Sequence, residues 1–159
     1  MSVTQDILRA WRQPKAVIRS KLDAGVREDR ALATLMGASA VIFISQWPNL
    51  SRAAFLDPSI PLEARMTGAL MGTVFMLPLL AYVVGGLSHL IARMFGGKGS
   101  WYSARLALFW ALLAVSPAML LQGLVAGFIG PGTQLLVVGL LVAAVFFYIW
   151  INMLIEAER

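Results

Sequence analysis

Residues 106–155 read LALFWALLAVSPAMLLQGLVAGFIGPGTQLLVVGLLVAAVFFYIWINMLI and contain no charged side chain. A helix that crosses the roughly 30 Å hydrocarbon core of a bilayer needs about 20 apolar residues. This run is long enough for two such helices if something interrupts it. The segment GFIGPGTQ, residues 127–134, interrupts it, because Pro131 lacks an amide donor and its flanking glycines disfavour a helix. The stretch therefore predicts two spans, at about 104–128 and 134–155.

Two further uncharged runs precede this one, Ala31–Ser51 and Met66–Ala92. They predict spans at about 31–50 and 67–92. The spans must be helices, because unpaired backbone groups are costly in lipid and the runs lack the alternating pattern of a barrel strand. Of the 159 residues, 59% are hydrophobic and only 13% are charged, which argues against a soluble all-helical protein. The sequence therefore predicts an all-α membrane protein with a four-helix transmembrane bundle over residues 31–155.

Lysine and arginine are unevenly divided among the loops. With four spans, eleven of them fall on one side, in residues 1–30, in the loop between the second and third spans, and at Arg159. The other side has only Arg52 and Arg65. The positive-inside rule places the basic side, both termini and the short tail 156–159 in the cytoplasm. Because the loops are short and the chain is compact, we expect the plasma (inner) membrane of a bacterium.

Residues 1–30 form a basic, amphipathic arm. Its apolar residues fall on one helical face before Pro14 and on a second stripe after it: Val3, Ile7, Leu8 and Trp11, then Val17, Ile18, Leu22 and Val26. This pattern is typical of an interfacial helix on an anionic leaflet, and the alternative is a helix packed on the protein's own cytoplasmic face. We expect the arm and the second cytoplasmic loop to contact anionic lipid headgroups through Arg12, Lys15, Arg19, Arg93, Lys98 and Arg105. Acidic residues reduce the net charge of the arm, so no nucleic acid is expected as a partner.

Ionisable and reactive groups are scarce within the spans. His89 is the only histidine, near the cytoplasmic end of its span, where an interfacial hydrogen-bonding role is expected. The chain has no cysteine, which excludes thiolate metal ligands and thiol nucleophiles. With no carboxylate in the runs, no catalytic, cofactor or metal site is predicted, and the protein is not expected to be an enzyme. Gln46, Gln122 and Asn152 either hold helices together or coordinate a solute.

Small residues and prolines predict how the spans pack. Gly68 with Gly72, and Gly123 with Gly127, have the four-residue spacing that lets helix backbones approach closely, within this chain or with another. Pro78 and Pro117 lie inside spans and should kink them.

The loop between the second and third spans begins FGGKGSW, residues 95–101. It is not a phosphate-binding loop, because Lys98 is followed by Gly99 rather than Ser or Thr, and a membrane helix precedes it. It resembles the loop of the YIP (Ypt-interacting protein) family, in which an apolar residue, Gly-Gly-x-Gly, Ser or Thr and an aromatic residue join two spans. The matching residues are Phe95, Gly96, Gly97, Gly99, Ser100 and Trp101, with Lys98 at the variable position and Pro117 as the mid-span proline of the following helix.

The resemblance extends over about residues 70–125 and implies an integral membrane protein. Family members usually have five spans, whereas four are predicted here, and the motifs that eukaryotic members use with Rab-type GTPases are not recognisable. Two functions fit. The first is a non-enzymatic scaffold, assembly or accessory subunit that binds anionic lipids and other integral membrane proteins or itself. The second is a small-solute transporter or channel component with a path along Pro78, Pro117, Gln122 and Asn152.

Overall fold

Four long helices dominate the computed structural model, which describes residues 2–159 and contains no strand within them. The first is α3 (Glu28–Leu56). The second is continuous through α4 (Leu62–Leu70), η1 (Met71–Met76) and α5 (Leu77–Met94), and α6 (Trp101–Phe128) and α7 (Thr133–Ala157) follow. All four are long and apolar enough to cross a membrane, so the predicted all-helical, four-span architecture is confirmed. The helices extend beyond the apolar runs, which is why α3 continues to Leu56 rather than ending near residue 50.

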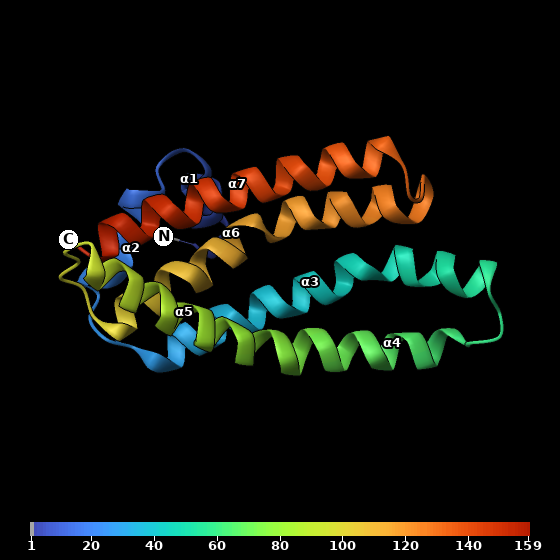
Figure 1. Cartoon of the computed structure of the whole chain (residues 1–159), viewed down its shortest axis with the longest axis horizontal. Helices are drawn as coiled ribbons and strands as arrows, with labels where there is room; N and C mark the ends of the chain where they lie inside the picture. The colour runs from blue at the N-terminus through green and yellow to red at the C-terminus, as the bar shows by residue number, and fades with distance from the viewer. Residues whose placement is uncertain (1) are drawn as a thin grey trace.

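The helix α6 is the centre of the bundle. It packs on α3 along much of its length, on α7, and on α5 near its start, whereas no Cα atom of α5 lies within 8 Å of one in α7 (Figure 1). In the most apolar 18-residue stretch of α6, half of the residues are buried inside the protein, compared with 6% in the corresponding stretch of α7. The face of α6 at these contacts carries small residues with no exposed surface, among them Ala104, Ala107, Ala111 and Ala114. Small side chains let three neighbouring helices approach one backbone.

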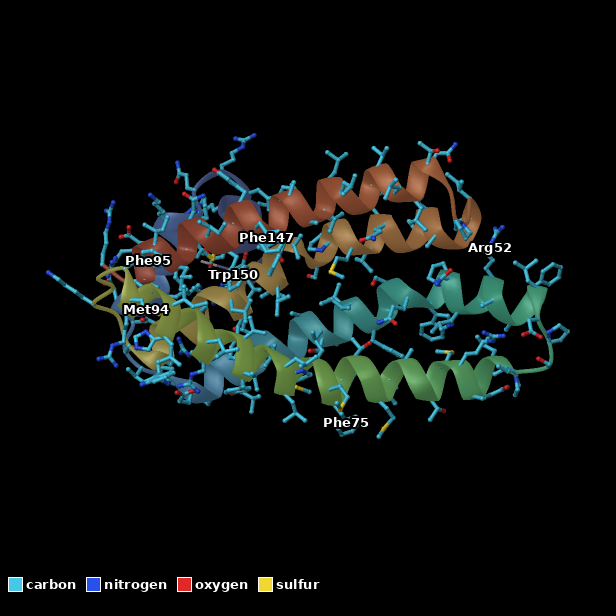
Figure 2. All side chains as sticks on the ribbon, viewed as in Figure 1. Arg52, Phe75, Met94, Phe95, Phe147 and Trp150 are labelled. Atoms are coloured by element: carbon cyan, nitrogen blue, oxygen red, sulfur yellow. The ribbon has the colours of Figure 1, made fainter. Side chains whose placement is uncertain are left out.

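One end of the bundle holds both termini and the α5–α6 loop, and we call it the basic end (Figure 1). The far end holds the α3–α4 and α6–α7 loops, with Arg52 beside the latter (Figure 2). There Arg52 Nη1 donates to the Gly127 carbonyl oxygen at 3.3 Å, and Arg65 pairs with Asp57 at 3.5 Å. The Ser59 hydroxyl and backbone N–H donate to Asp57, and this lowers the pKa of that carboxyl below its ordinary value.

Two glycines determine how closely α3 and α6 approach. A Cβ atom on Gly123 would overlap the Ser45 carbonyl oxygen, and one on Gly127 would overlap Pro48. The structure thus places this pair at a backbone-to-backbone contact. Gly68 and Gly72 differ, because a Cβ atom on either would meet no other atom within 4 Å. The second pair therefore packs on no helix of this chain within the described residues.

Three prolines, Pro48, Pro78 and Pro117, lie within the long helices, and the local structure around each is different. Pro78 lies two residues after η1, which is six residues of π-helix, and the Leu77 N–H donates to the Gly72 carbonyl oxygen five residues earlier. Because proline has no N–H, a local π-turn is one way to re-pair the backbone around it. Pro117 lies inside α6, which stays continuous as one helix. Pro48 lies inside α3 at the Gly127 contact, a position that the sequence had placed close to the end of a span.

The N-terminal arm folds as two short helices, α1 (Val3–Arg12) and α2 (Pro14–Asp23). Its apolar face is turned toward the bundle, since Val17 and Ile18 have no exposed surface and belong to the core shared with α6 and α7. The indole Nε1 of Trp11 donates to the Ala114 carbonyl oxygen at 2.8 Å. The apolar residues of the arm are therefore divided: Val17 and Ile18 pack on protein, as the alternative expectation has it, whereas Val3, Leu8 and Val26 are 55%, 67% and 69% exposed.

Replacing Trp11 by phenylalanine should loosen the arm. Phenylalanine keeps an aromatic ring but loses the bond to Ala114, which is worth about 1 kcal/mol and hence about fivefold in the open population. We expect trypsin to cleave after Lys15 several-fold faster in the variant in detergent micelles. Trp47→Phe is the matched control, because Trp47 is 46% exposed and lies far from the arm. Equal cleavage rates for the two variants and the wild type would show that the bond does not hold the arm.

Candidate functional site

The α5–α6 loop starts with a tight reversal at the end of α5. Gly96 has φ +87°, a left-handed conformation that glycine adopts without strain. Its N–H donates to the Arg93 carbonyl oxygen at 3.1 Å, and the Gly97 N–H donates to the Ala92 carbonyl oxygen at 2.8 Å. These two bonds form a Schellman motif, which satisfies carbonyl groups at the helix end. The first two glycines of the loop thus end α5 within two residues.

The loop ends in an equally tight helix start. The Ser100 hydroxyl accepts from the Ser103 N–H at 3.1 Å, and the Ser103 hydroxyl accepts from the Ser100 N–H at 2.9 Å. This reciprocal pair is a capping box, although the sequence has Ser103 where Glu or Gln is usual. Only Gly97, Lys98 and Gly99 lie between Gly96, the left-handed residue that ends α5, and Ser100, the N-cap of α6.

The end of the last helix docks on these three residues. The Lys98 N–H donates to the Glu158 carbonyl oxygen at 2.7 Å, and the Gly99 N–H donates to Glu158 Oε2 at 3.1 Å. A Cβ atom on Gly97 would lie 2.7 Å from that carboxylate oxygen, and one on Gly99 would overlap the Ala157 carbonyl oxygen and lie 3.0 Å from the carboxyl carbon of Glu158. The glycines of the motif therefore make room for Glu158, a role that the sequence alone did not reveal.

His89 completes this contact from α5. Its Nδ1 lies 2.7 Å from Glu158 Oε1, and both side chains are buried. The imidazole ring packs edge-to-face on Trp101, with ring centroids 4.7 Å apart. His89 is thus a hydrogen-bonding residue, and its partner is a buried carboxylate from outside the uncharged runs. Glu158 belongs to the segment 156–159, which the sequence predicts as a short tail, and lies 69 residues from His89 in the sequence.

Two of the arginines expected at lipid headgroups form ion pairs within the protein. Arg19 Nε lies 3.0 Å from Glu156 Oε1, and Arg19 Nη2 also donates to the Glu156 carbonyl oxygen, so α2 is tied to the last turn of α7. Arg105 pairs with Glu28 at 2.6 Å. The other expected headgroup residues have side chains without an ion-pair partner in residues 2–159, namely Arg12, Lys15, Arg93 and Lys98.

A groove of about 470 Å³ runs beside this loop, between α5 and α7. Ile91 and Ala92 line one side, Trp150 and Ile151 line the other, and Gly97 and Glu158 lie at its end. The Trp150 indole Nε1 is buried and has no hydrogen-bond acceptor within residues 2–159. Near the groove, Met94 and Phe95 are 83% and 87% exposed at the basic end of the molecule (Figure 2).

The uncharged polar residues of the spans make local contacts. Gln46 Nε2 donates to Thr73 Oγ1 at 2.6 Å and joins α3 to η1. Asn152 Nδ2 donates to the Tyr148 carbonyl oxygen of its own helix at 2.7 Å. The Gln122 amide nitrogen lies 3.3 Å from the position of a Cβ atom on Gly139, so it sits in the α6–α7 contact. Of these three residues and the prolines Pro78 and Pro117, only Gln122 lines one of the four best-formed cavities of residues 2–159.

Four apolar helices, joined by short loops and closed at one end by the glycine loop, define a polytopic α-helical membrane protein. A sequence model described as the Yip1 domain matches residues 10–158, from the end of α1 to the docked Glu158. The chain therefore belongs to the Yip1 domain family, which confirms the resemblance seen in its loop. Neither a curated protein nor a solved structure matches the chain.

Proposed function

We propose that this Yip1 family protein is a non-enzymatic membrane protein that binds other integral membrane proteins, as a scaffold, assembly factor or accessory subunit. The observation that carries the proposal is the groove between α5 and α7. The spans α5 and α7 both flank the central helix α6, and they leave a mostly apolar groove between them. This groove lies beside the loop that is shared with the family. A transmembrane helix of a partner fits a groove of this kind.

Trp150 gives the groove a broad apolar wall on the α7 side, since its side chain lines the groove beside Ile151. Large aromatic side chains are well suited to packing against a partner protein. Exposed Met94 and Phe95 add apolar surface at the basic end, where a partner helix would leave the membrane.

We further propose that the basic end faces the cytoplasm and that the membrane is the inner membrane of a bacterium. The positive-inside rule supports the orientation, because eleven of the thirteen lysines and arginines belong to segments at this end. The short loops support the assignment to a bacterium. A reporter fused after Arg159 should be active only on the cytoplasmic side, and an active periplasmic reporter would contradict the orientation.

A transport function has less support. The candidate path residues Gln122 and Asn152 are engaged in helix contacts, and Gln46 is bonded to Thr73.

Cysteine-directed cross-linking tests the groove, because the chain has no cysteine of its own. Ile91→Cys and Ile151→Cys place one thiol on each wall of the groove. Each variant is labelled in native membranes with a thiol-specific photoactivatable cross-linker, and protein adducts are identified by mass spectrometry. We expect several-fold more protein adduct from these positions than from Leu79→Cys and Leu141→Cys, whose leucines are each 62% exposed and line neither wall of the groove.

The identity of the adduct decides the outcome. A defined membrane protein, or a second copy of the chain, linked at both groove positions supports the proposal. Adducts with lipid at all four positions, in equal yield, would contradict it, because the groove would then be an ordinary lipid-facing surface.

A further inference from the structure

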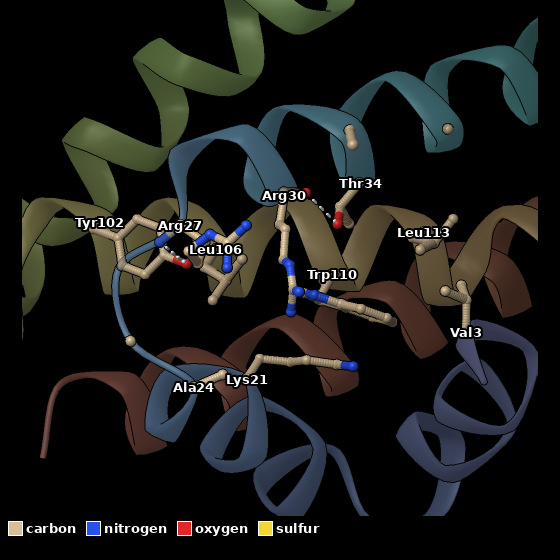
Figure 3. A pocket seen from close by; sticks show the side chains of 13 residues that line it. Val3, Lys21, Ala24, Arg27, Arg30, Thr34, Tyr102, Leu106, Trp110 and Leu113 are labelled. Carbon is tan, nitrogen blue, oxygen red and sulfur yellow. Dashed lines mark hydrogen bonds between the residues drawn. The ribbon is translucent and has the colours of Figure 1, made fainter. Parts of the chain in front are cut away.

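A second cavity, of about 460 Å³, lies on another face of the basic end, enclosed by the arm, α3 and α6 (Figure 3). The link between α2 and α3 forms its outer wall, with Gly25 in a left-handed conformation at φ +93°. The Tyr102 hydroxyl accepts from the Arg27 N–H at 3.2 Å and holds this link against α6. The cavity is separate from the groove between α5 and α7, since the two share no lining residue.

Three basic side chains line the outer part of this cavity. Lys21 forms an ion pair with Asp6 at 2.6 Å, and Arg27 forms one with Asp29 at 3.2 Å. Arg30 has no ion-pair partner among residues 2–159, and its side chain extends beside Trp110 (Figure 3). Lys21 Nζ lies 4.7 Å from the centre of the Trp110 ring. The cavity therefore has a positive charge that the protein itself does not neutralise.

The inner part of the cavity is apolar. Along α3 the lining passes from Arg30 to Gly37, a distance of about 10 Å at the usual helical rise. Leu106 and Leu113 line the facing side of α6. Gly37 leaves open space, because a Cβ atom there would meet nothing within 4 Å. The cavity is thus charged at its outer end and apolar toward the membrane interior. A phospholipid has the same arrangement, because its phosphate lies at the membrane surface and its acyl chains extend inward.

We propose that this cavity binds one anionic phospholipid, with its phosphate at Arg30 and part of an acyl chain along Gly37. The guanidinium group can donate two parallel hydrogen bonds to phosphate oxygens. The unpaired charge of Arg30 disfavours the choline group of a zwitterionic lipid, so the headgroup carries a net negative charge, as in phosphatidylglycerol. The proposal is independent of the protein-binding groove, and the cross-linking experiment does not test it.

Retention of lipid by the purified full-length protein tests the site. The protein is exchanged into detergent with phosphatidylglycerol, phosphatidylcholine or inorganic phosphate, and bound molecules are counted by native mass spectrometry. We expect one retained phosphatidylglycerol, little phosphatidylcholine and no retained phosphate. Arg30→Gln should weaken phosphatidylglycerol binding about fivefold or more, since one basic residue contributes about 1 kcal/mol at a charged membrane surface.

Two matched variants separate this site from general surface charge. Gly37→Leu fills the apolar part and leaves all charges in place, and it should also remove the retained lipid. Arg12→Gln makes the same change of charge on the arm but outside the cavity, and this variant should still retain the lipid. Circular dichroism and thermal unfolding check that each variant is folded.

Either of two results would overturn the proposal. The first is equal weakening by Arg12→Gln and Arg30→Gln, which would mean diffuse electrostatic attraction. The second is strong binding of inorganic phosphate with no effect of Gly37→Leu, which would mean a site for free anions rather than lipid.

Discussion

Replacing Gly123 by leucine is expected to separate α3 from α6 and to destabilise the whole bundle. The new side chain would collide with the Ser45 carbonyl oxygen of α3, and backbone atoms cannot move aside as a flexible side chain can. Overpacking a core costs about 1–3 kcal/mol where side chains can adjust, so we expect a loss above about 3 kcal/mol. For a chain of this size that corresponds to a fall of roughly 10 °C in the apparent melting temperature in detergent.

Gly68→Leu is the matched control. It makes the same substitution in a span of the same chain, at a position where a Cβ atom meets nothing within 4 Å. We expect a change of melting temperature within about 2 °C, corresponding to roughly 0.5 kcal/mol. If both variants lost stability equally, the substitution itself rather than the α3–α6 contact would be responsible. If neither did, the helices would not approach as closely as the structure shows.

The second large effect is expected for Glu158→Ala. Removing the carboxylate leaves His89 Nδ1 without its partner at a buried position and the Gly99 N–H without its partner at a partly buried one. Leaving buried polar groups unpaired costs about 1–3 kcal/mol each, so we expect a total loss of about 3 kcal/mol. Hydrogen–deuterium exchange should show the amides of residues 97–100 exchanging at least tenfold faster than in the wild type.

Two controls show whether the effect belongs to this contact. Glu63→Ala removes an exposed carboxylate from α4 and should leave exchange in the loop unchanged. His89→Leu combined with Glu158→Ala should cost less than the sum of the single changes, with a coupling of about 1–3 kcal/mol. Additive costs would mean that His89 and Glu158 stabilise the protein independently, in conflict with the 2.7 Å contact.

The spans could be predicted from sequence because hydrophobic length is a local property. The uncharged runs and the break at Pro131 were sufficient to count four helices, and α6 and α7 end within a few residues of the expected positions. The arm was predicted as helices on either side of Pro14, which is where α1 and α2 meet. The surface that covers the arm's apolar face was not predictable, because lipid and protein satisfy the same apolar pattern.

The site was harder to predict because its members are distant in sequence. Nothing near Glu158 indicates that it meets His89, and an acidic residue just beyond an apolar run looks like part of a solvated tail. The glycine loop could be recognised by its pattern, but the pattern does not show that two of its glycines make space for a carboxylate. The two glycine pairs likewise have identical spacing, and only the placement of α3 against α6 distinguishes the packed pair from the open one.

The docking of Glu158 also constrains the order in which the protein can be assembled. Lys98 and Gly99 leave the ribosome before α7 does, and until that helix has entered the membrane their N–H groups have no acceptor from Glu158. The turn between the second and third spans is therefore completed only after the fourth span has been synthesised. In a chain that lacks this span the two helix caps of the loop can still form, but the Lys98 and Gly99 N–H groups between them would be left to water.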